Sequence, residues 1–371
     1  MSASEIQEIV IITPARIHCG LFSAGRELPV EFGGCGMMVD SPATIVRFGR
    51  PSMEAASRSS EDQVAAWVRR WLSTFEHRGT PTAMSQSTSV PFQVFVEQQP
   101  TPHIGMGTGS QLAAAVAVGI SLFQHLALPS AYEIAARMER GRRSAIGISG
   151  FFQGGFLVDR GAAVNQPVST IESRHTLPDD WRCVIVTPSG QVGLFGNAEQ
   201  SAFQSCPASS ADFRAGSIEL VRNHVLPALA AGHVAEFGEA LYDFNRRSGR
   251  MFEASQGGIY CSEATSAIIE WIRCSGFPGA VQSSWGPSVA AVIPDPDAAS
   301  QLEQSIRNRF GSAVDIVVTR FNNSGARVQT RRDGALESEW TLAAIDSISL
   351  TSHNSETSTP RGFESKQIVL G

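Results

Sequence analysis

The spacing of apolar and polar residues predicts a first half that mixes strands with helices. Short apolar runs bounded by glycines predict strands at residues 6–12 and 42–48, and alternation predicts a third at 92–96. One amphipathic helix is expected over residues 64–75, where the apolar residues repeat at helical spacing: Val64, Trp67, Val68, Trp71, Leu72 and Phe75.

A largely apolar stretch at residues 112–128 follows a glycine-rich loop. Gln124 and His125 interrupt it, so it predicts a buried core helix rather than a membrane span. Ser130 and Glu133 have the spacing of a capping box and predict a further helix that runs through Arg140. A short strand at 156–158 is expected to end in a hairpin turn at 159–161.

The second half predicts a smaller α+β unit. We expect strands at 183–187, 289–293 and 314–319, with helices at about 211–226, 234–246, 262–273 and 297–310. From residue 345 the chain is polar and rich in Ser and Thr, which is typical of a tail. The expected organisation is an N-terminal lobe at 1–180, a C-terminal lobe at 181–344 and a polar tail at 345–371, and the fold class is α+β.

Composition narrows the function classes. The 371 residues carry a formal net charge of −6, which argues against nucleic-acid or membrane binding through bulk charge. The six cysteines lack the spacing of a zinc site and are expected to be reduced thiols. The N-terminus lacks the basic and apolar regions of a signal peptide, so a cytoplasmic location is expected.

The loop GMGTGS at residues 105–110 runs directly into the apolar helix. Glycines let the backbone approach a ligand, and the unpaired N–H groups at a helix start attract an anion. The loop lacks the lysine of a Walker A motif, and Ser110 replaces the third glycine of a dinucleotide fingerprint. Two interpretations stay open here: a phosphate cradle, or a tight turn whose small residues serve packing.

Four arginines cluster shortly after this helix, at 137, 140, 142 and 143. Arginine forms paired hydrogen bonds with phosphates and carboxylates. Arg137 fits a helix C-terminus, which favours cations, whereas Arg142 and Arg143 precede the glycine-rich run SAIG and are candidate ligand contacts.

Three segments together resemble the galactokinase, homoserine kinase, mevalonate kinase and phosphomevalonate kinase (GHMP) superfamily: PARIH at 14–18, PHIGMGTGS at 102–110 and GAVQSSWGP at 279–287. Within it, the chain is most similar to the β-ribofuranosylaminobenzene 5′-phosphate synthase family. That family carries a PARIH-x-GL segment, a GTG loop, an RS-x-IG segment and a GGF-x-VD strand, which match residues 14–21, 107–109, 143–147 and 154–159.

The resemblance implies a two-lobed fold, with an N-terminal lobe like ribosomal protein S5 and a ferredoxin-like C-terminal lobe. It implies a step of methanopterin biosynthesis in which 5-phosphoribosyl 1-diphosphate is joined to 4-aminobenzoate or 4-hydroxybenzoate, with release of carbon dioxide and diphosphate. Mg²⁺ is the expected cofactor, no organic cofactor is expected, and a homodimer is a further expectation from the family.

Two alternatives remain: an ATP-dependent kinase of the same superfamily, and a non-catalytic relative that only binds a ligand. A kinase benefits from a carboxylate or lysine base, and residues 144–150 contain none. Ribosyl transfer with decarboxylation needs no strong base, because the ring expels carbon dioxide rather than a proton. It needs anion stabilisation, orientation of the ring and exclusion of water.

The candidate residues follow from these motifs. The expected catalytic residues are Arg16, His18, His103, Arg143 and Ser144. The expected phosphate- and substrate-binding residues are Gly105, Gly107, Thr108, Gly109, Ser110, Gln111, Arg142, Gly147, Ser283, Ser284 and Trp285. Asp40 and Ser110 are candidate metal ligands.

The histidines are candidate phosphate donors or mild acids, and a structural role is their alternative. Phe151, Phe152 and Trp285 are candidates for the wall that holds the ring, with core packing as the alternative for the two phenylalanines. Turn capping is the expected role of Asp159.

Overall fold

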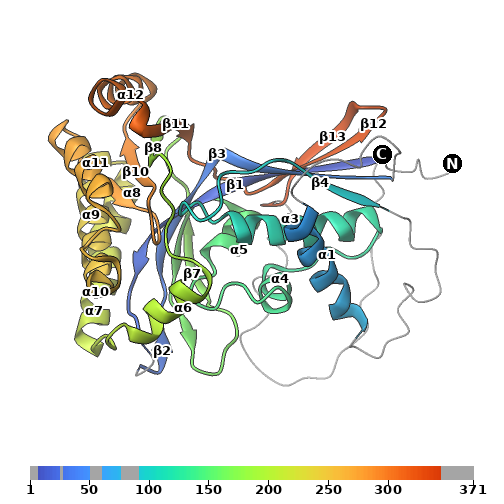
Figure 1. Cartoon of the computed structure of the whole chain (residues 1–371), viewed down its shortest axis with the longest axis horizontal. Helices are drawn as coiled ribbons and strands as arrows, with labels where there is room; N and C mark the ends of the chain where they lie inside the picture. The colour runs from blue at the N-terminus through green and yellow to red at the C-terminus, as the bar shows by residue number, and fades with distance from the viewer. Residues whose placement is uncertain (1–6, 26–27, 51–60, 77–91, 344–371) are drawn as a thin grey trace.

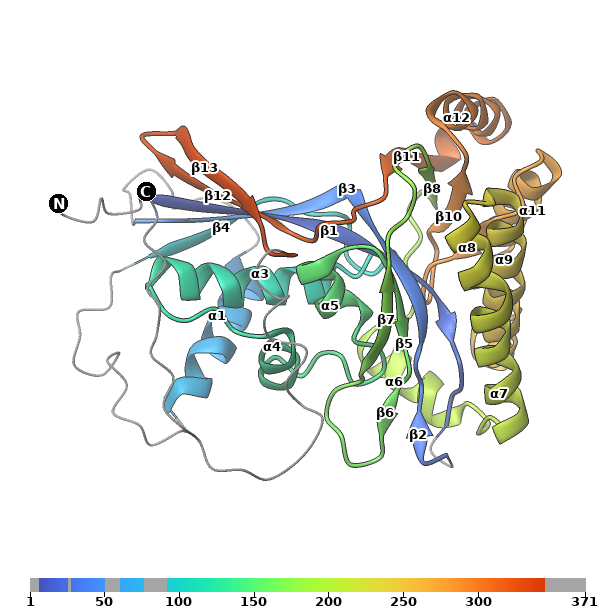
Figure 2. The ribbon, with the colours of Figure 1, turned by 180° about the vertical axis from the view of Figure 1, so that it is seen from behind.

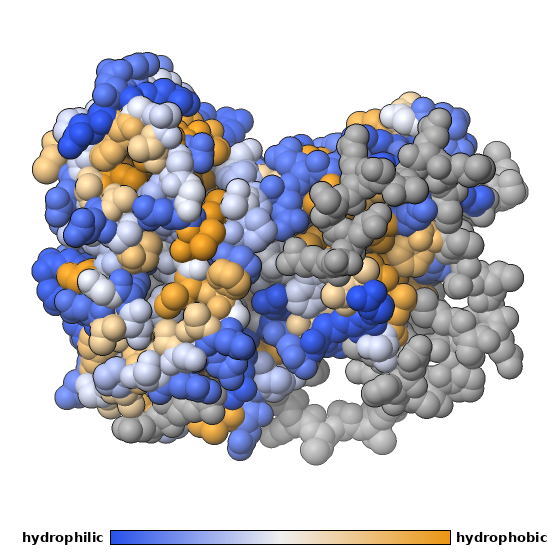
Figure 3. All heavy atoms as spheres, viewed as in Figure 1, coloured by the Kyte–Doolittle hydropathy of each residue, from blue (hydrophilic) through white to orange (hydrophobic). Residues whose placement is uncertain are grey.

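A computed structural model describes residues 7–25, 28–50, 61–76 and 92–343. The predicted tail at 345–371 lies outside these residues. A long antiparallel sheet extends across the molecule, with one group of helices beneath one half of it and a second group beside the other half (Figures 1 and 2). The surface facing the viewer of Figure 1 is mostly polar, with apolar patches scattered between polar ones (Figure 3).

The large sheet has the strand order β13-β12-β1-β3-β5-β7, and β4 pairs with β3. Its long central strands each carry a run of buried apolar residues, which explains their length. The strands of this sheet are β1 (Glu8–Leu21), β3 (Gly34–Gly49), β4 (Gln93–Gln98), β5 (Phe156–Asp159), β7 (Ile171–His175), β12 (Arg327–Arg332) and β13 (Ala335–Thr341).

Among the described residues, four helices cover one half of this sheet, and α3 lies at their centre, against β1 and β3. Ile9, Ile11 and Phe48 from the strands pack against its apolar side chains in one core. The four helices are α1 (Glu61–Glu76), α3 (Thr108–Phe123), α4 (Ala131–Arg137) and α5 (Ile146–Gln153).

The second sheet has the order β11-β8-β10-β9, which is the order of a ferredoxin-like βαββαβ unit. Side chains alternate along β8: Cys183 and Ile185 face one core, and Val184 and Val186 face the other. The strands are β8 (Arg182–Pro188), β9 (Ala280–Gln282), β10 (Val289–Ile293) and β11 (Val314–Arg320).

Helices cover both faces of the second sheet. Ile272 of α11 and Leu302 of α12 pack on one face, and Phe237 and Leu241 of α9 join the core on the other. The remaining elements are α6 (Gly196–Ser205), α7 (Ala211–Leu220), the π-helix η1 (Val221–Val225), α8 (Leu226–Ala231), α9 (Val234–Arg250), α10 (Glu253–Gln256), α11 (Glu263–Cys274), α12 (Pro296–Phe310), the 3₁₀ turn η2 (Gly311–Ala313), and the short pair β2 (Val30–Glu31) and β6 (Ala162–Ala163).

The predicted capping box is present, since the Ser130 side chain accepts from the Glu133 N–H and the Glu133 carboxylate accepts from the Ser130 N–H. The helix it opens ends at Arg137, however, and not at Arg140. The predicted hairpin at 159–161 is wrong, because β5 pairs with β3 and β7, whereas β6 pairs with β2. Asp159 does cap this turn, as predicted: its Oδ1 accepts from the Gly161 N–H at 2.8 Å.

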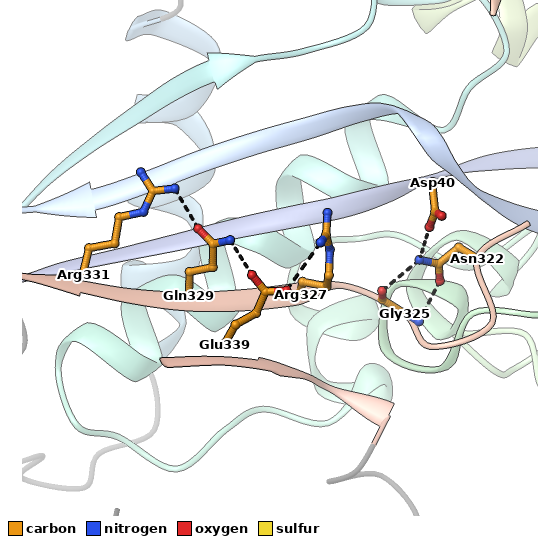
Figure 4. Close-up of polar contacts among 7 residues, drawn as sticks. All are labelled: Asp40, Asn322, Gly325, Arg327, Gln329, Arg331 and Glu339. Carbon is orange, nitrogen blue, oxygen red and sulfur yellow. Dashed lines mark hydrogen bonds and ion pairs between the residues drawn. The ribbon is translucent and has the colours of Figure 1, made fainter. Parts of the chain in front are cut away.

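The last two strands return to the first sheet. β12 pairs with β1, with Glu8 opposite Arg331, and β13 pairs with β12. Hydrogen bonds link Arg331, Gln329, Glu339 and Arg327 across these strands (Figure 4). The division into lobes at residue 180 stays a prediction, and strands from beyond it complete the first sheet.

Candidate active site

Three segments far apart in the sequence meet at one point of the fold. The Arg16 N–H of β1 donates to the Met106 carbonyl of the glycine loop at 3.0 Å. The Ser283 hydroxyl donates to the Gly105 carbonyl at 2.7 Å and accepts from the His18 N–H at 3.0 Å. These bonds hold β1, the glycine loop and the 283–287 loop together.

A cavity of about 1100 Å³ opens at this junction. Most of the predicted residues line it: Arg16, His18, His103, Gly105, Gly107, Thr108, Gly109, Ser110, Arg142, Arg143, Ser144, Ser284 and Trp285. Its size suits a ligand as large as a phosphorylated sugar with a second small molecule.

The structure of the glycine loop is compatible with both interpretations that the sequence left open, a phosphate cradle and a tight turn that needs small residues for packing. Gly107 lies at the N-cap of α3 with φ 70°, and a Cβ there would come within 2.9 Å of the Arg16 side chain. A Cβ on Gly105 would come within 2.4 Å of the Ser283 carbonyl oxygen. Both glycines are therefore required for packing, while the N-terminus of α3 still faces the cavity.

The N-terminus of α3 lies at this end of the cavity, and the N-terminus of α5 lies beside it, behind the cavity wall. The Gln111 side chain of α3 donates to the Gly147 carbonyl of α5 at 2.6 Å and joins the two helices. Within the described part of the chain, the N–H groups of Thr108 and Gly109 have no hydrogen-bond acceptor. The dipole of α3 and these free N–H groups favour an anion at the start of the helix.

Asp159 fixes the start of α5. It is fully buried and accepts from the Ala145 N–H at 2.7 Å as well as from the Gly161 N–H and the Ser169 hydroxyl. Burial raises the pKa of Asp159, and these hydrogen bonds act in the opposite direction. Asp159 is thus a structural acceptor beneath Ser144 and its neighbours.

Arg16 crosses the gap between the two helix starts. Its Nη2 donates to the Gly105 carbonyl at 3.4 Å, and its buried Nε has no hydrogen-bond partner among the described residues. Burial lowers the pKa of Arg16 to about 10, while the charge of Glu199 opposes the shift. The guanidinium therefore stays charged at neutral pH and has a free donor for an anion.

His18 also lines the cavity and is only 6% exposed. Burial, and then the positive charge of Arg16, keeps its pKa well below the ordinary value. The ring is neutral at neutral pH, and its Nε2 has no partner among the described residues. His18 can form a hydrogen bond with a ligand, but it does not carry the extra proton that a mild acid would need.

A group of aromatic side chains forms another part of the cavity wall. Trp285 packs edge-on against Phe203 and Phe252, with ring centroids 5.3 and 4.8 Å apart. Arg143 lies over the Phe203 ring, 4.2 Å from its centroid. His103 stacks on Phe195 at 3.9 Å at the cavity wall.

Comparison with known proteins agrees with this architecture. A family model described as the C-terminal domain of GHMP kinases matches residues 225–312. Homoserine kinase from Cytophaga hutchinsonii superposes with a TM-score of 0.61 at 15% identity, covering 88% of this chain and 99% of that one. Mevalonate kinase from L. major superposes with a TM-score of 0.60 at 13% identity, covering 85% and 96%.

The chain has the GHMP-kinase fold.

Sequence comparison narrows the likeness within this fold. Beta-ribofuranosylphenol 5'-phosphate synthase from Methanothermobacter thermautotrophicus is 26% identical over 339 residues, which cover 86% of this chain and 98% of the relative. The protein of the same name from Archaeoglobus fulgidus is 28% identical over 333 residues, covering 85% and 98%. The resemblance that the motifs predicted is confirmed.

Several predicted residues of this GHMP-fold protein lie behind the cavity wall. Gln111, Gly147 and Ser283 do not line it and instead join its surrounding segments, as described above. Phe151 and Phe152 are 0% and 4% exposed and belong to the core under the large sheet, so the packing alternative holds for both.

Asp40 lies outside the cavity. It is exposed near the middle of β3, where its Oδ1 accepts from the Asn322 side chain at 2.9 Å (Figure 4). The bend of β3 carries it to the junction with residue 322 rather than to the glycine loop. In the described part of the chain, no three His, Cys, Asp or Glu side chains form a group that could hold a metal ion.

Sequence analysis missed Glu199, Phe203 and Arg140 as cavity residues. Glu199 and Phe203 come from α6, a short helix with a weak apolar pattern that no motif marked. Arg140 was noted only as one of a cluster, yet its side chain reaches Gly109 and stacks on Trp67, 4.7 Å from the ring centroid.

Among the described residues, no helix combines the length and apolar content that a membrane crossing requires.

Proposed function

We propose that this protein is a decarboxylating phosphoribosyltransferase of methanopterin biosynthesis. It joins 5-phosphoribosyl 1-diphosphate to 4-hydroxybenzoate or 4-aminobenzoate through a carbon–carbon bond and releases carbon dioxide and diphosphate. The observation that carries the proposal is one cavity lined by arginines, by the N-terminus of α3 and by an aromatic wall. The curated relatives are named after a ribofuranosylphenol phosphate, the product expected from the hydroxybenzoate.

The start of α3 at Thr108 and the guanidinium of Arg16 take the diphosphate. As the bond from the anomeric carbon to the diphosphate breaks, negative charge grows on the leaving oxygens, and these fixed donors stabilise it. Neutral His18 adds a hydrogen bond through its free Nε2. Arg142 and Arg143 are placed to hold the 5′-phosphate or the substrate carboxylate.

Trp285 and Phe203 hold the benzoate ring against the sugar. The ring carbon that bears the carboxylate attacks the anomeric carbon, and the electron pair of the breaking carbon–carboxylate bond restores aromaticity as carbon dioxide leaves. No base is required for this step. Holding both reactants in one water-poor cavity supplies the main part of the acceleration.

Magnesium fits this site only together with the diphosphate. The cavity carboxylates Glu139 and Glu199 are both paired with arginines, so a metal would be held mainly by substrate phosphates, with the hydroxyls of Thr108 and Ser110 nearby. Mg²⁺ would neutralise charge on the departing diphosphate. A homodimer stays an expectation from the family, and a cytoplasmic location stays an expectation from the N-terminal sequence.

A kinase is the second candidate, since solved structures of the same fold include kinases. The sequence has a single lysine, Lys366, outside the described residues. Both carboxylates that line the cavity are in ion pairs, so the described part of the chain presents no unpaired carboxylate and no lysine there as a base.

The test is release of labelled carbon dioxide from carboxyl-labelled 4-hydroxybenzoate or 4-aminobenzoate with phosphoribosyl diphosphate and Mg²⁺. We expect release that depends on both substrates, while ATP is not consumed. Release from neither benzoate refutes the transferase, and ATP consumption dependent on a small-molecule hydroxyl would favour the kinase.

A further inference from the structure

Glu199 is an unexpected side chain in this cavity. It extends from α6 and links two separate segments, since its Oε1 accepts from the Trp285 indole N–H at 3.2 Å and pairs with Arg143 Nη1. Both contacts go to the same oxygen. Within the described residues, the second oxygen, Oε2, has no hydrogen-bond partner.

A carboxylate at this position opposes anion binding. Its charge acts on the pKa values of Arg16 and Arg140, so it reaches the phosphate end of the cavity as well as Arg143. Like charges in one site cost binding free energy unless another contact offsets the repulsion. Glu139, the other carboxylate that lines the cavity, pairs with Arg70 and is largely exposed.

The surroundings of Glu199 fit an aromatic ligand with a hydrogen-bond donor. Trp285, which holds Glu199 in place, is part of the aromatic wall with Phe203 and Phe252. A ring that lies on this wall brings its edge to the Glu199 carboxylate. The substrates of the proposed reaction carry an N–H or O–H group on the ring atom opposite their carboxylate.

A contact between Glu199 and this group would assist the proposed reaction. When the carboxylate-bearing carbon attacks, the ring loses its aromatic system and positive charge spreads to the nitrogen or oxygen on the opposite side. A carboxylate that accepts the hydrogen of that group gains strength as the charge develops. It therefore stabilises the transition state more than the bound substrate.

Resting on the proposed function, we propose that Glu199 binds the para amino or hydroxyl group of the aromatic substrate through Oε2. It thereby selects benzoates with a hydrogen-bond donor at that position and accelerates the attack.

The test compares 4-hydroxybenzoate with 4-methoxybenzoate, which donates electrons into its ring but has no hydrogen to give. We expect the wild type to prefer the hydroxy compound by about 10²-fold or more in kcat/KM. Glu199→Gln keeps an acceptor but loses the charge, so kcat should fall about 10²-fold with a small change in KM. Glu199→Met, which has no comparable acceptor, should lose the preference altogether.

Two controls separate this role from the ion pair. Arg143→Met removes the partner of Glu199 but should retain the preference for the hydroxy compound. Glu172→Gln is the matched control: the Glu172 side chain is 31% exposed, close to the 28% of Glu199, and it is likewise paired with an arginine, Arg222. This substitution should leave both the rate and the preference unchanged.

Calorimetry measures binding of 4-hydroxybenzoate and 4-methoxybenzoate in the presence of inorganic diphosphate and Mg²⁺. It tests the preference even if the protein binds these compounds without turnover. A preference that survives in Glu199→Met overturns the inference alone. Loss of Mg²⁺-dependent diphosphate binding in Glu199→Gln also overturns it, because Glu199 would then be a metal ligand. A wild type that binds neither benzoate overturns the inference and the proposed function together.

Discussion

The substitution Gly107→Ala tests whether the glycine loop positions Arg16 for an anion. Gly107 has φ 70°, a backbone conformation that alanine adopts at a cost of about 1–2 kcal/mol. The new Cβ would also come within 2.9 Å of both Cβ and Nε of Arg16. Because Arg16 is buried between the two helix starts, it must move.

Gly190 provides a matched control. Its φ is 71°, and a Cβ there meets nothing within 4 Å. Gly190→Ala should therefore lower the free energy of unfolding by about 1–2 kcal/mol through the backbone alone. Gly107→Ala should lower it by about 2–5 kcal/mol, since overpacking adds about 1–3 kcal/mol.

The two variants should differ more sharply in ligand binding. One hydrogen bond to a charged group is worth about 1.5–3 kcal/mol, so displacing Arg16 should weaken binding of inorganic diphosphate about 10- to 100-fold. Gly190→Ala should bind it like the wild type. Denaturant unfolding and calorimetry measure the two quantities. If Gly107→Ala matched Gly190→Ala in both, Arg16 would not be held by this loop for anion binding.

Four further predictions follow from single side chains. Arg16→Gln should weaken diphosphate binding about 10- to 100-fold in calorimetry and leave the unfolding midpoint near that of the wild type, and unchanged affinity would exclude Arg16 from the anion site. The lowered pKa of His18 means that the unfolded chain binds the proton more readily. Stability should therefore fall below about pH 6.5 by at most about 1.4 kcal/mol per pH unit, and His18→Gln should reduce that slope in urea titrations. Asp159→Asn sets an amide against the Ala145 N–H and should cost about 1–3 kcal/mol in thermal unfolding, whereas an unchanged midpoint would show that the buried acceptor is dispensable. Phe151→Ala should cost about 3–5 kcal/mol of stability with KM for the benzoate unchanged, and a raised KM would return this ring to the substrate wall.

The residues that the sequence located best are those within contiguous motifs. Residues 102–110 carry their own backbone signal, a glycine turn before an apolar helix, so local physics was enough to place them. Residues 14–18 were singled out by the resemblance alone, and the strand predicted at 6–12 continues through them as β1. Only the family resemblance linked these segments to Ser283, because local residue spacing cannot predict a hydrogen bond between residues so far apart in the sequence.

The failures arose where tertiary packing decides a local choice. No element was predicted for the glycine-rich run at 146–153, yet it forms α5 because α3, α4 and β1 bury it on several sides. Phe151 and Phe152 follow a motif but point into that core. Glu199 is the reverse case: no motif surrounds it in the sequence, yet it lines the cavity. Only the folding of α6 over the cavity brings it to Trp285.

The return of β12 to the edge of β1 has a consequence for how the protein is made. Glu8 pairs with Arg331, so the ribosome produces β1 on the order of tens of seconds before its partner strand exists. During that interval, the edge of β1 exposes unpaired N–H and carbonyl groups beside Ile9 and Ile11, which are fully buried in the finished fold. Completion of the first sheet must wait until β12 and β13 have been translated, and until then this edge of β1 is open to pairing with another chain.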